Sequence, residues 1–172
     1  MSKLVGVNLT LLFGFLAVLT SSILWIEFGF AAIVQTMVIL LVAAIGEHLV
    51  SGKGYYHYTN RNGFFVGRVP TWIPLMWVVV IQGTLLLSSL IGMKGLDAVA
   101  LSGVISASLD LYFIEPLLSR KLSMWIWTSV DGGYFAFIPD QVNRFTAPFG
   151  NYLTWLIFPI LTNLILICSV IL

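Results

Sequence analysis

Two carboxylates that lie within apolar runs, Asp110 and Glu47, are the side chains of this sequence best suited to chemistry. Asp110 lies about a turn and a half inside one run, and Glu47 lies in the last turn of another. A charged group is costly in lipid, so each is expected to face the interior of a helix bundle and to serve a function such as proton transfer. The structural alternatives are an Asp110 pair with an arginine, and a Glu47 pair with Lys53 or Arg68.

Asp110 also belongs to a small, polar face of its predicted helix. Spacings of one, three, one and three place the members of that face on one side of the helix. They are Ser102, Gly103, Ser106, Ala107 and Asp110. Close packing against a neighbouring helix would explain such a face, and Ser106 is also a candidate substrate-binding residue. Asp97 is expected to cap the N-terminus of the same helix.

Two loops, at residues 46–77 and 115–151, hold most of the remaining polar and aromatic side chains. Their mixture of Gly, Tyr, Trp and charged residues suits a backbone that folds into the mouth of a bundle and lines a cavity. The alternative is an aromatic belt at the level of the lipid headgroups. The candidate binding residues in these loops are Tyr56, His57, Tyr58, Trp127 and Tyr134.

Other polar residues carry weaker signals. Glu47 and His48 point about 100° apart on a helix, so one is expected to face the bundle and the other the interface. Glu115 precedes Pro116, which is expected to end its helix, and it is therefore expected at the membrane surface. His48 and His57 match no familiar metal-ligand spacing, and no metal site is predicted.

The elements that must position these residues follow from composition. The chain has 172 residues, of which 59% are hydrophobic and 9% charged, and its mean hydropathy is +1.02. Soluble domains have about a quarter of their residues charged, so the sequence predicts an integral membrane protein. Apolar runs predict five spans in one domain of residues 1–172, an all-α polytopic bundle, at residues 4–26, 30–50, 71–91, 96–114 and 152–172.

Charge and cysteine content narrow the setting. A net charge of +1 argues against a nucleic-acid partner. Seven of the eight Lys and Arg residues lie on the side of the N-terminus and the two polar loops, and only Lys94 lies opposite. This bias predicts a protein of the cell membrane whose N-terminus and polar loops are cytoplasmic. Cys168, the lone cysteine, lies in the last apolar run and excludes a disulfide within the chain.

The same residues resemble a known family. The resemblance covers roughly residues 46–155 and rests on Glu47, Gly54, Tyr56, Tyr58, Val69, Pro70, Ile73, Pro74, Trp77, Asp110, Pro116, Trp127, Gly132, Gly133 and Tyr134. In these positions the chain is similar to the carotenoid biosynthesis membrane-protein family, which includes the bisanhydrobacterioruberin hydratases and related carotenoid 1,2-hydratases.

The resemblance implies addition of water to a terminal C=C bond of a long polyene. Such a reaction needs an acid that protonates the alkene, aromatic faces that shield the cation, and a positioned water. Asp110 would be the acid and Glu47 the carboxylate that orients water. Tyr56, Tyr58, Trp127 and Tyr134 would form the cavity wall. The reaction requires no cofactor, and the lipid-soluble substrate would enter from the membrane lipids.

Two other functions remain open from the sequence. An accessory subunit of a membrane complex would use its aromatic loops to pack on a membrane-protein partner. It predicts a broad outward face of small residues and no internal pocket. A small proton-coupled transporter would use Asp110 and Glu47 as a relay, although the absence of an inverted repeat weighs against it. A catalytic site predicts instead that Asp110 and Glu47 converge on a cavity that is open to the lipid.

Overall fold

The computed structural model describes residues 3–128 and 147–171, and this part of the chain is mostly helical. Its long helices are α1 (Leu4–Phe28), α2 (Phe30–Gly52), α3 (Trp72–Leu90), α4 (Gly95–Leu109) and α5 (Phe149–Ile171). α4 continues directly into η2 (Asp110–Lys121), a π-helix, to make one segment of 27 residues. Five helices of the described part are therefore long and apolar enough to cross a membrane, at the places where the apolar runs predict them.

Short strands join the two polar loops. β1 (Tyr56–Tyr58), the 3₁₀-helix η1 (Asn60–Asn62), β2 (Phe65–Val66) and β3 (Val69–Pro70) lie between α2 and α3, and β4 (Trp125–Trp127) follows η2. β1 pairs antiparallel with β4, and β2 pairs antiparallel with β3. The prediction of a purely helical protein with loops did not include these strands.

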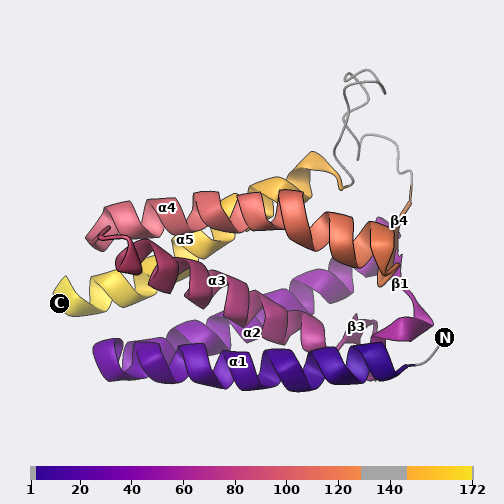
Figure 1. The fold of residues 1–172 in the computed structure, drawn as a ribbon, viewed down its shortest axis with the longest axis horizontal. Helices are drawn as coiled ribbons and strands as arrows, with labels where there is room; N and C mark the ends of the chain where they lie inside the picture. The colour runs from indigo at the N-terminus through magenta and orange to yellow at the C-terminus, as the bar shows by residue number, and fades with distance from the viewer. Residues whose placement is uncertain (1–2, 129–146, 172) are drawn as a thin grey trace.

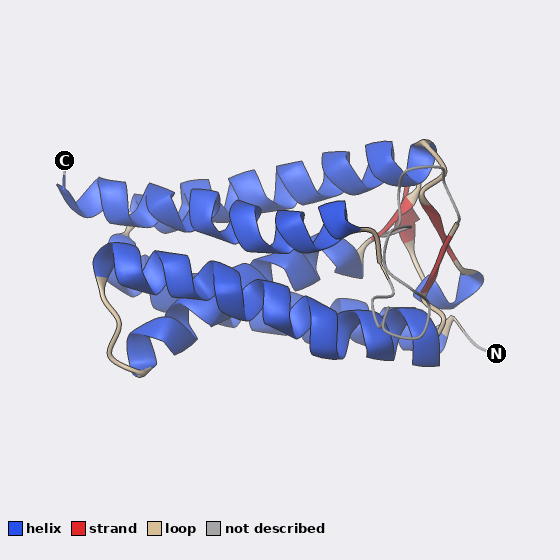
Figure 2. Ribbon diagram, turned by 90° about the horizontal axis from the view of Figure 1, so that it is seen from above, coloured by secondary structure: helices blue, strands red, loops and turns tan. Residues whose placement is uncertain are grey.

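The helices lie lengthwise beside one another, as Figure 1 shows. The N-terminus and the strands lie at one end of the bundle, and the C-terminus and the α3–α4 connection lie at the other. Figure 2, which colours the strands red, shows the same division from above. The described parts of both polar loops therefore share one end of the molecule, and their residues can build a common site.

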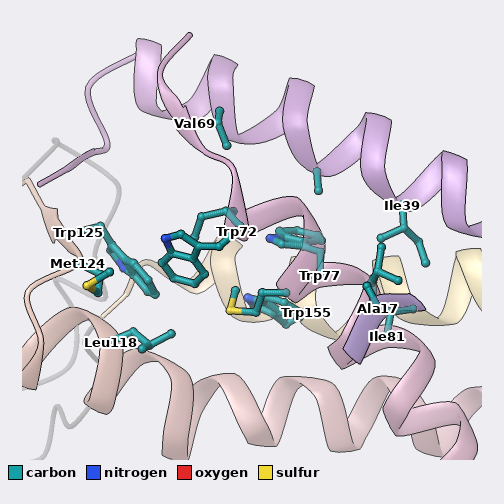
Figure 3. Packing of buried hydrophobic residues seen from close by; sticks show 14 of the residues in the cluster. Ala17, Ile39, Val69, Trp72, Trp77, Ile81, Leu118, Met124, Trp125 and Trp155 are labelled. Atoms are coloured by element: carbon teal, nitrogen blue, oxygen red, sulfur yellow. The ribbon is translucent and has the colours of Figure 1, made fainter. Parts of the chain in front are cut away.

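Two clusters of buried apolar side chains hold the helices together. The cluster toward the strand end contains four tryptophans, drawn in Figure 3, namely Trp72, Trp77, Trp125 and Trp155. The second cluster lies toward the other end and takes residues from all five helices, among them Leu24, Ala32, Leu85, Val99 and Leu166. Because lipid is as apolar as these side chains, close packing rather than the hydrophobic effect stabilises such contacts in a membrane.

A polar layer of buried and half-buried side chains also links all five helices. Its members are Thr20, Ser21, Gln35, Thr36, Gln82, Ser102 and Asn163. At its centre, the Gln82 amide donates to Oε1 of Gln35 at 3.2 Å, and the Gln35 amide donates to Oδ1 of Asn163 at 2.6 Å. Hydrogen bonds between helices in lipid are worth about 0.6–2 kcal/mol each, so this layer helps to fix the register of the bundle.

The small face of α4 packs as predicted. Ser102, Gly103, Ser106 and Asp110 are buried. A Cβ atom placed on Gly103 would lie 2.5 Å from the backbone oxygen of Leu156 in α5, so only glycine permits this approach of the two helices. The face therefore sets how closely α4 and α5 approach each other, and with it the position of Asp110.

Two predictions about this helix are wrong. Asp97 does not cap α4: Lys94 occupies the cap position, and Asp97 lies in the first turn, where a negative charge still favours the helix N-terminus. Pro116 does not end the helix either, because the chain continues as the π-helix to Lys121. Proline lacks an N–H group and clashes with the carbonyl four residues back. Since π-helical bonds reach five residues back, the wider turn accommodates it.

Candidate functional site

A cavity lies at the strand end of the bundle, and the empty space in it, adjoining open solvent included, is about 330 Å³. Residues of α2, β1, α3, η2, β4 and α5 line it. They comprise three carboxylates, one amide, six aromatic and three aliphatic side chains, namely Glu47, Asp110, Glu115, Asn151, Tyr56, Tyr58, Trp77, Trp125, Trp127, Trp155, Ile73, Met76 and Ile114. An apolar pocket with a few convergent polar groups is the usual form of a small-molecule site.

Glu47 is held by three hydrogen-bond donors. The Tyr56 and Tyr58 hydroxyls both donate to its Oε2 atom, Tyr58 at 2.7 Å, and the Trp77 indole N–H donates to Oε1 at 3.1 Å. The alternation of side chains along β1 explains why the two tyrosines, two residues apart, reach the same carboxylate. His48 is exposed, so the expected division between the two adjacent residues of α2 is confirmed.

The pairing of β1 with β4 builds the aromatic wall. Tyr56 lies opposite Trp127 and Tyr58 opposite Trp125. The Tyr56 and Trp127 rings meet edge to face at 4.8 Å between centroids, and the Tyr58 and Trp125 rings do so at 6.4 Å. Such arrangements are favoured by the ring quadrupoles, so the pairs stabilise the strands as well as line the cavity.

Asp110 is buried at the junction of α4 and η2, and it lines the same cavity. The Asn151 amide donates to its Oδ2 atom at 2.6 Å. Trp77 and Trp155 stack beside the cavity with ring centroids 4.6 Å apart, and Figure 3 shows how the two rings lie. The cavity therefore places a carboxyl group, fixed by an amide, next to aromatic faces.

The two tyrosines act as hydrogen-bond donors in this site. Burial raises the pKa of the Tyr56 phenol above its usual range, and the negative charge of Glu47 adds to this effect. The same two causes raise the pKa of the Tyr58 phenol well above its usual range. Both phenols therefore keep their protons at neutral pH and remain donors to Glu47.

The prediction that Glu115 lies at the membrane surface is wrong. Only 2% of the surface of Glu115 is exposed, and it lines the cavity. The Trp127 indole donates to its Oε2 atom at 3.0 Å. The cause of the error is the same as for the helix boundary: the π-helix carries the chain past Pro116 and turns Glu115 inward.

Two predicted binding residues, Ser106 and His57, do not line the cavity, and a third cannot be placed. Ser106 makes a 2.9 Å hydrogen bond with Thr84 of α3, which is a packing contact. His57 is exposed on the face of β1 opposite the two tyrosines. Tyr134 lies outside the described residues. Among residues 3–128 and 147–171, no group of three or more His, Cys, Asp and Glu side chains is arranged to hold a metal ion.

Asn151 and Trp155 line the cavity although sequence reasoning did not assign them to a site. Both lie in the first turns of α5. In the sequence, Asn151 ends the second polar loop and Trp155 lies in the last apolar run. Amphipathic spacing could place them on one helix face, but it could not show that this face meets Asp110.

Comparison with protein families decides what kind of protein carries this cavity. A family model described as carotenoid biosynthesis protein matches residues 6–170. The chain belongs to this family. No curated protein and no solved structure matches the chain at a significant level.

The match covers most of this carotenoid biosynthesis protein, including every residue that lines the cavity. Carotenoid chemistry implies a lipid-soluble substrate, which suits a cavity formed between apolar helices. The family description does not specify the reaction, so the reaction must be inferred from the cavity.

Proposed function

We propose that this protein is an enzyme that adds water to a terminal C=C bond of a long polyene, with Asp110 as the acid. The observation that carries the proposal is the convergence of Asp110 and Glu47 on one cavity with aromatic walls. An accessory subunit would need no such internal pocket. In this proposal the end group of the polyene, which carries the terminal C=C bond, enters the cavity.

Protonation of the alkene is the first step. The protonated Asp110 carboxyl gives its proton to the less substituted carbon, and the π electrons of the alkene form the new C–H bond. A tertiary cation results on the neighbouring carbon, and Asp110 becomes a carboxylate. An apolar setting favours a neutral carboxylic acid that can act in this way. The Asn151 amide fixes the orientation of the carboxyl.

The cation is stabilised by the walls of the cavity. The faces of Tyr56, Trp77 and Trp127 attract positive charge. The Glu47 carboxylate adds a negative charge whose position is fixed in advance by its three donors. A water molecule then adds to the cation through an oxygen lone pair, and loss of one proton from that oxygen leaves a tertiary alcohol.

Expression in a host that accumulates acyclic and monocyclic carotenoids tests the proposal. The pigments of cells with the wild-type chain are expected to gain one water by mass. Asp110→Asn is expected to abolish this gain, while Asp97→Asn, the same change at an exposed position of the same helix, is expected to retain it. Unchanged pigments in cells that contain folded wild-type protein would overturn the proposed reaction for these substrates.

A further inference from the structure

The π-helix brings a third carboxylate to the site. Asp110 and Glu115 are five residues apart, and on an α-helix they would point about 140° away from each other. In a π-helix, hydrogen bonds join residues five apart, as in the 2.9 Å bond from the Leu122 N–H to the Leu117 carbonyl. Residues i and i+5 then come to one side, and both carboxylates line the same cavity.

The three carboxylates differ in what surrounds them. Glu47 accepts three donor hydrogen bonds, which fill most of its about four acceptor positions. These bonds leave it little capacity to receive a proton or to bind water. Glu115 accepts the Trp127 indole on Oε2.

We infer that Glu115 is the base of the proposed hydration, a role that rests on the reaction described above. When water adds to the tertiary cation, a proton must leave the new C–OH₂⁺ group. Glu115 takes this proton as the C–O bond forms, and a neutral alcohol remains. Glu115 then carries one proton more than before, and Asp110 carries one fewer.

A final proton transfer returns Asp110 to its protonated state. Transfer of the proton from Glu115 to Asp110, along one side of η2, restores both groups. No proton has been gained or lost overall, and the net change is alkene plus water to alcohol. Glu47 remains an anion throughout and serves to stabilise the cation, in place of the water-orienting role expected from the sequence.

A reaction run in deuterium oxide distinguishes the two steps, which are protonation of the alkene by Asp110 and transfer of a proton from the added water to Glu115. The purified chain would be placed in phosphatidylcholine vesicles that contain an acyclic carotene with isopropylidene ends. The wild type is expected to form alcohol. In Glu115→Gln, alcohol formation is expected to fall about 100-fold or more, as for loss of a general base. The recovered alkene should still gain deuterium, because Asp110 can form the cation and then take back a proton.

The controls make each outcome decisive. Asp110→Asn is expected to lose both alcohol and deuterium exchange, and Glu27→Gln, at an exposed position of α1, is expected to lose neither. If Glu115→Gln forms alcohol at the wild-type rate, or loses exchange together with alcohol, the role of Glu115 is overturned while hydration stands. If the folded wild type neither hydrates nor exchanges, the proposed function itself fails.

A second variant covers the case in which Glu115→Gln does not fold. Glu115→Asp keeps a carboxylate on a shorter side chain. It is expected to slow alcohol formation while exchange into the recovered alkene persists. If folded Glu115→Asp loses alcohol formation and deuterium exchange to the same extent, the assignment of Glu115 as the base is contradicted.

Discussion

Glu47, Tyr56, Tyr58 and Trp77 form a cluster in which one acceptor serves three donors. A donor buried without its acceptor costs about 1–3 kcal/mol, so the carboxylate matters to the fold as well as to the proposed reaction. The negative charge of Glu47 in turn favours neutral phenols. The protonation of the tyrosines and the position of Glu47 are therefore coupled.

The tyrosine cluster gives a pH prediction. Because the pKa of both phenols is raised in the folded chain, the unfolded chain releases their protons first, and folding stability should fall as pH rises above about 10. In the folded protein, the phenolate absorbance gained between about pH 9 and 11 should be equal in the wild type and in Tyr56→Phe/Tyr58→Phe. An absorbance step smaller by two phenolates in the double variant would contradict the raised pKa values.

Single residues of the site were predictable where cost in lipid singles them out. Asp110 and Glu47 could be recognised because carboxylates within apolar runs are rare, and the structure brings both to one cavity. Glu115 could not, because its side of the helix depends on a π-helical turn that the apolar pattern does not reveal. Tyr56 and Tyr58 could be recognised as a pair, but their shared acceptor depends on how α2 meets β1.

At the scale of elements, the short helix η1 links the first polar loop to the second through hydrogen bonds. The Asn62 amide donates to the Met124 carbonyl at 2.5 Å, and its Oδ1 atom accepts the Trp72 indole N–H at 3.0 Å. The Arg61 guanidinium donates to the Leu122 carbonyl at 2.6 Å. These contacts hold β1 beside β4 and so maintain the aromatic wall.

Substitution of Asn62 tests this fastening. Asn62→Ala should lower the free energy of unfolding by about 1–3 kcal/mol, because the buried Trp72 indole loses its acceptor. Asn60→Ala, at an exposed position of the same short helix, should change it by less than about 0.5 kcal/mol. Denaturant titration in mixed micelles measures both. Equal stabilities of the two variants would show that Asn62 does not fasten the loops.

The contact between α4 and α5 makes a second prediction about elements. Gly103→Ala should destabilise the protein by about 1–3 kcal/mol, because its Cβ would meet the Leu156 backbone and the Ile160 side chain. At Gly83, in α3, a Cβ meets no atom within 4 Å, so Gly83→Ala should be neutral or slightly stabilising. Thermal unfolding of the two variants gives the comparison, and a Gly103→Ala variant as stable as the wild type would contradict the close approach.

The two ends of the molecule differ, and the end that holds the polar loops is called the polar end. The strands, the cavity and the N-terminus share the polar end, while the α3–α4 connection and the C-terminus lie at the other (Figure 1). The distribution of Lys and Arg favours a cytoplasmic polar end. The proposed reaction would then draw its water from the cytoplasm and its polyene from the lipid.

Cysteine labelling in intact cells tests this orientation. In a Cys168→Ala background, Met93→Cys in the α3–α4 connection should react with a membrane-impermeant maleimide added outside. Asn60→Cys at the strand end should react only after the membrane is opened. Both positions are exposed in the structure, so accessibility within the protein is matched. The reverse labelling pattern would place the cavity on the outer side.

The layout of the whole molecule was largely predictable, because apolar runs of spanning length set the helices. The meeting of the two loops at one end followed from the same runs. The pairing of β1 with β4 did not, since three-residue strands such as Tyr56–Tyr58 carry too little pattern to be told from an aromatic loop. The polar layer that contains Gln82 could not be predicted from the sequence either, because the members of this layer come from all five helices.

The source of the product oxygen tests the central claim most directly. Purified protein in vesicles would be given an acyclic carotene with isopropylidene ends in water labelled with heavy oxygen. Hydration predicts a tertiary alcohol that carries one labelled oxygen, formed by the wild type and by Asp97→Asn but not by Asp110→Asn. Absence of the alcohol with folded wild-type protein, or equal amounts with Asp110→Asn, would contradict acid-catalysed hydration at this cavity.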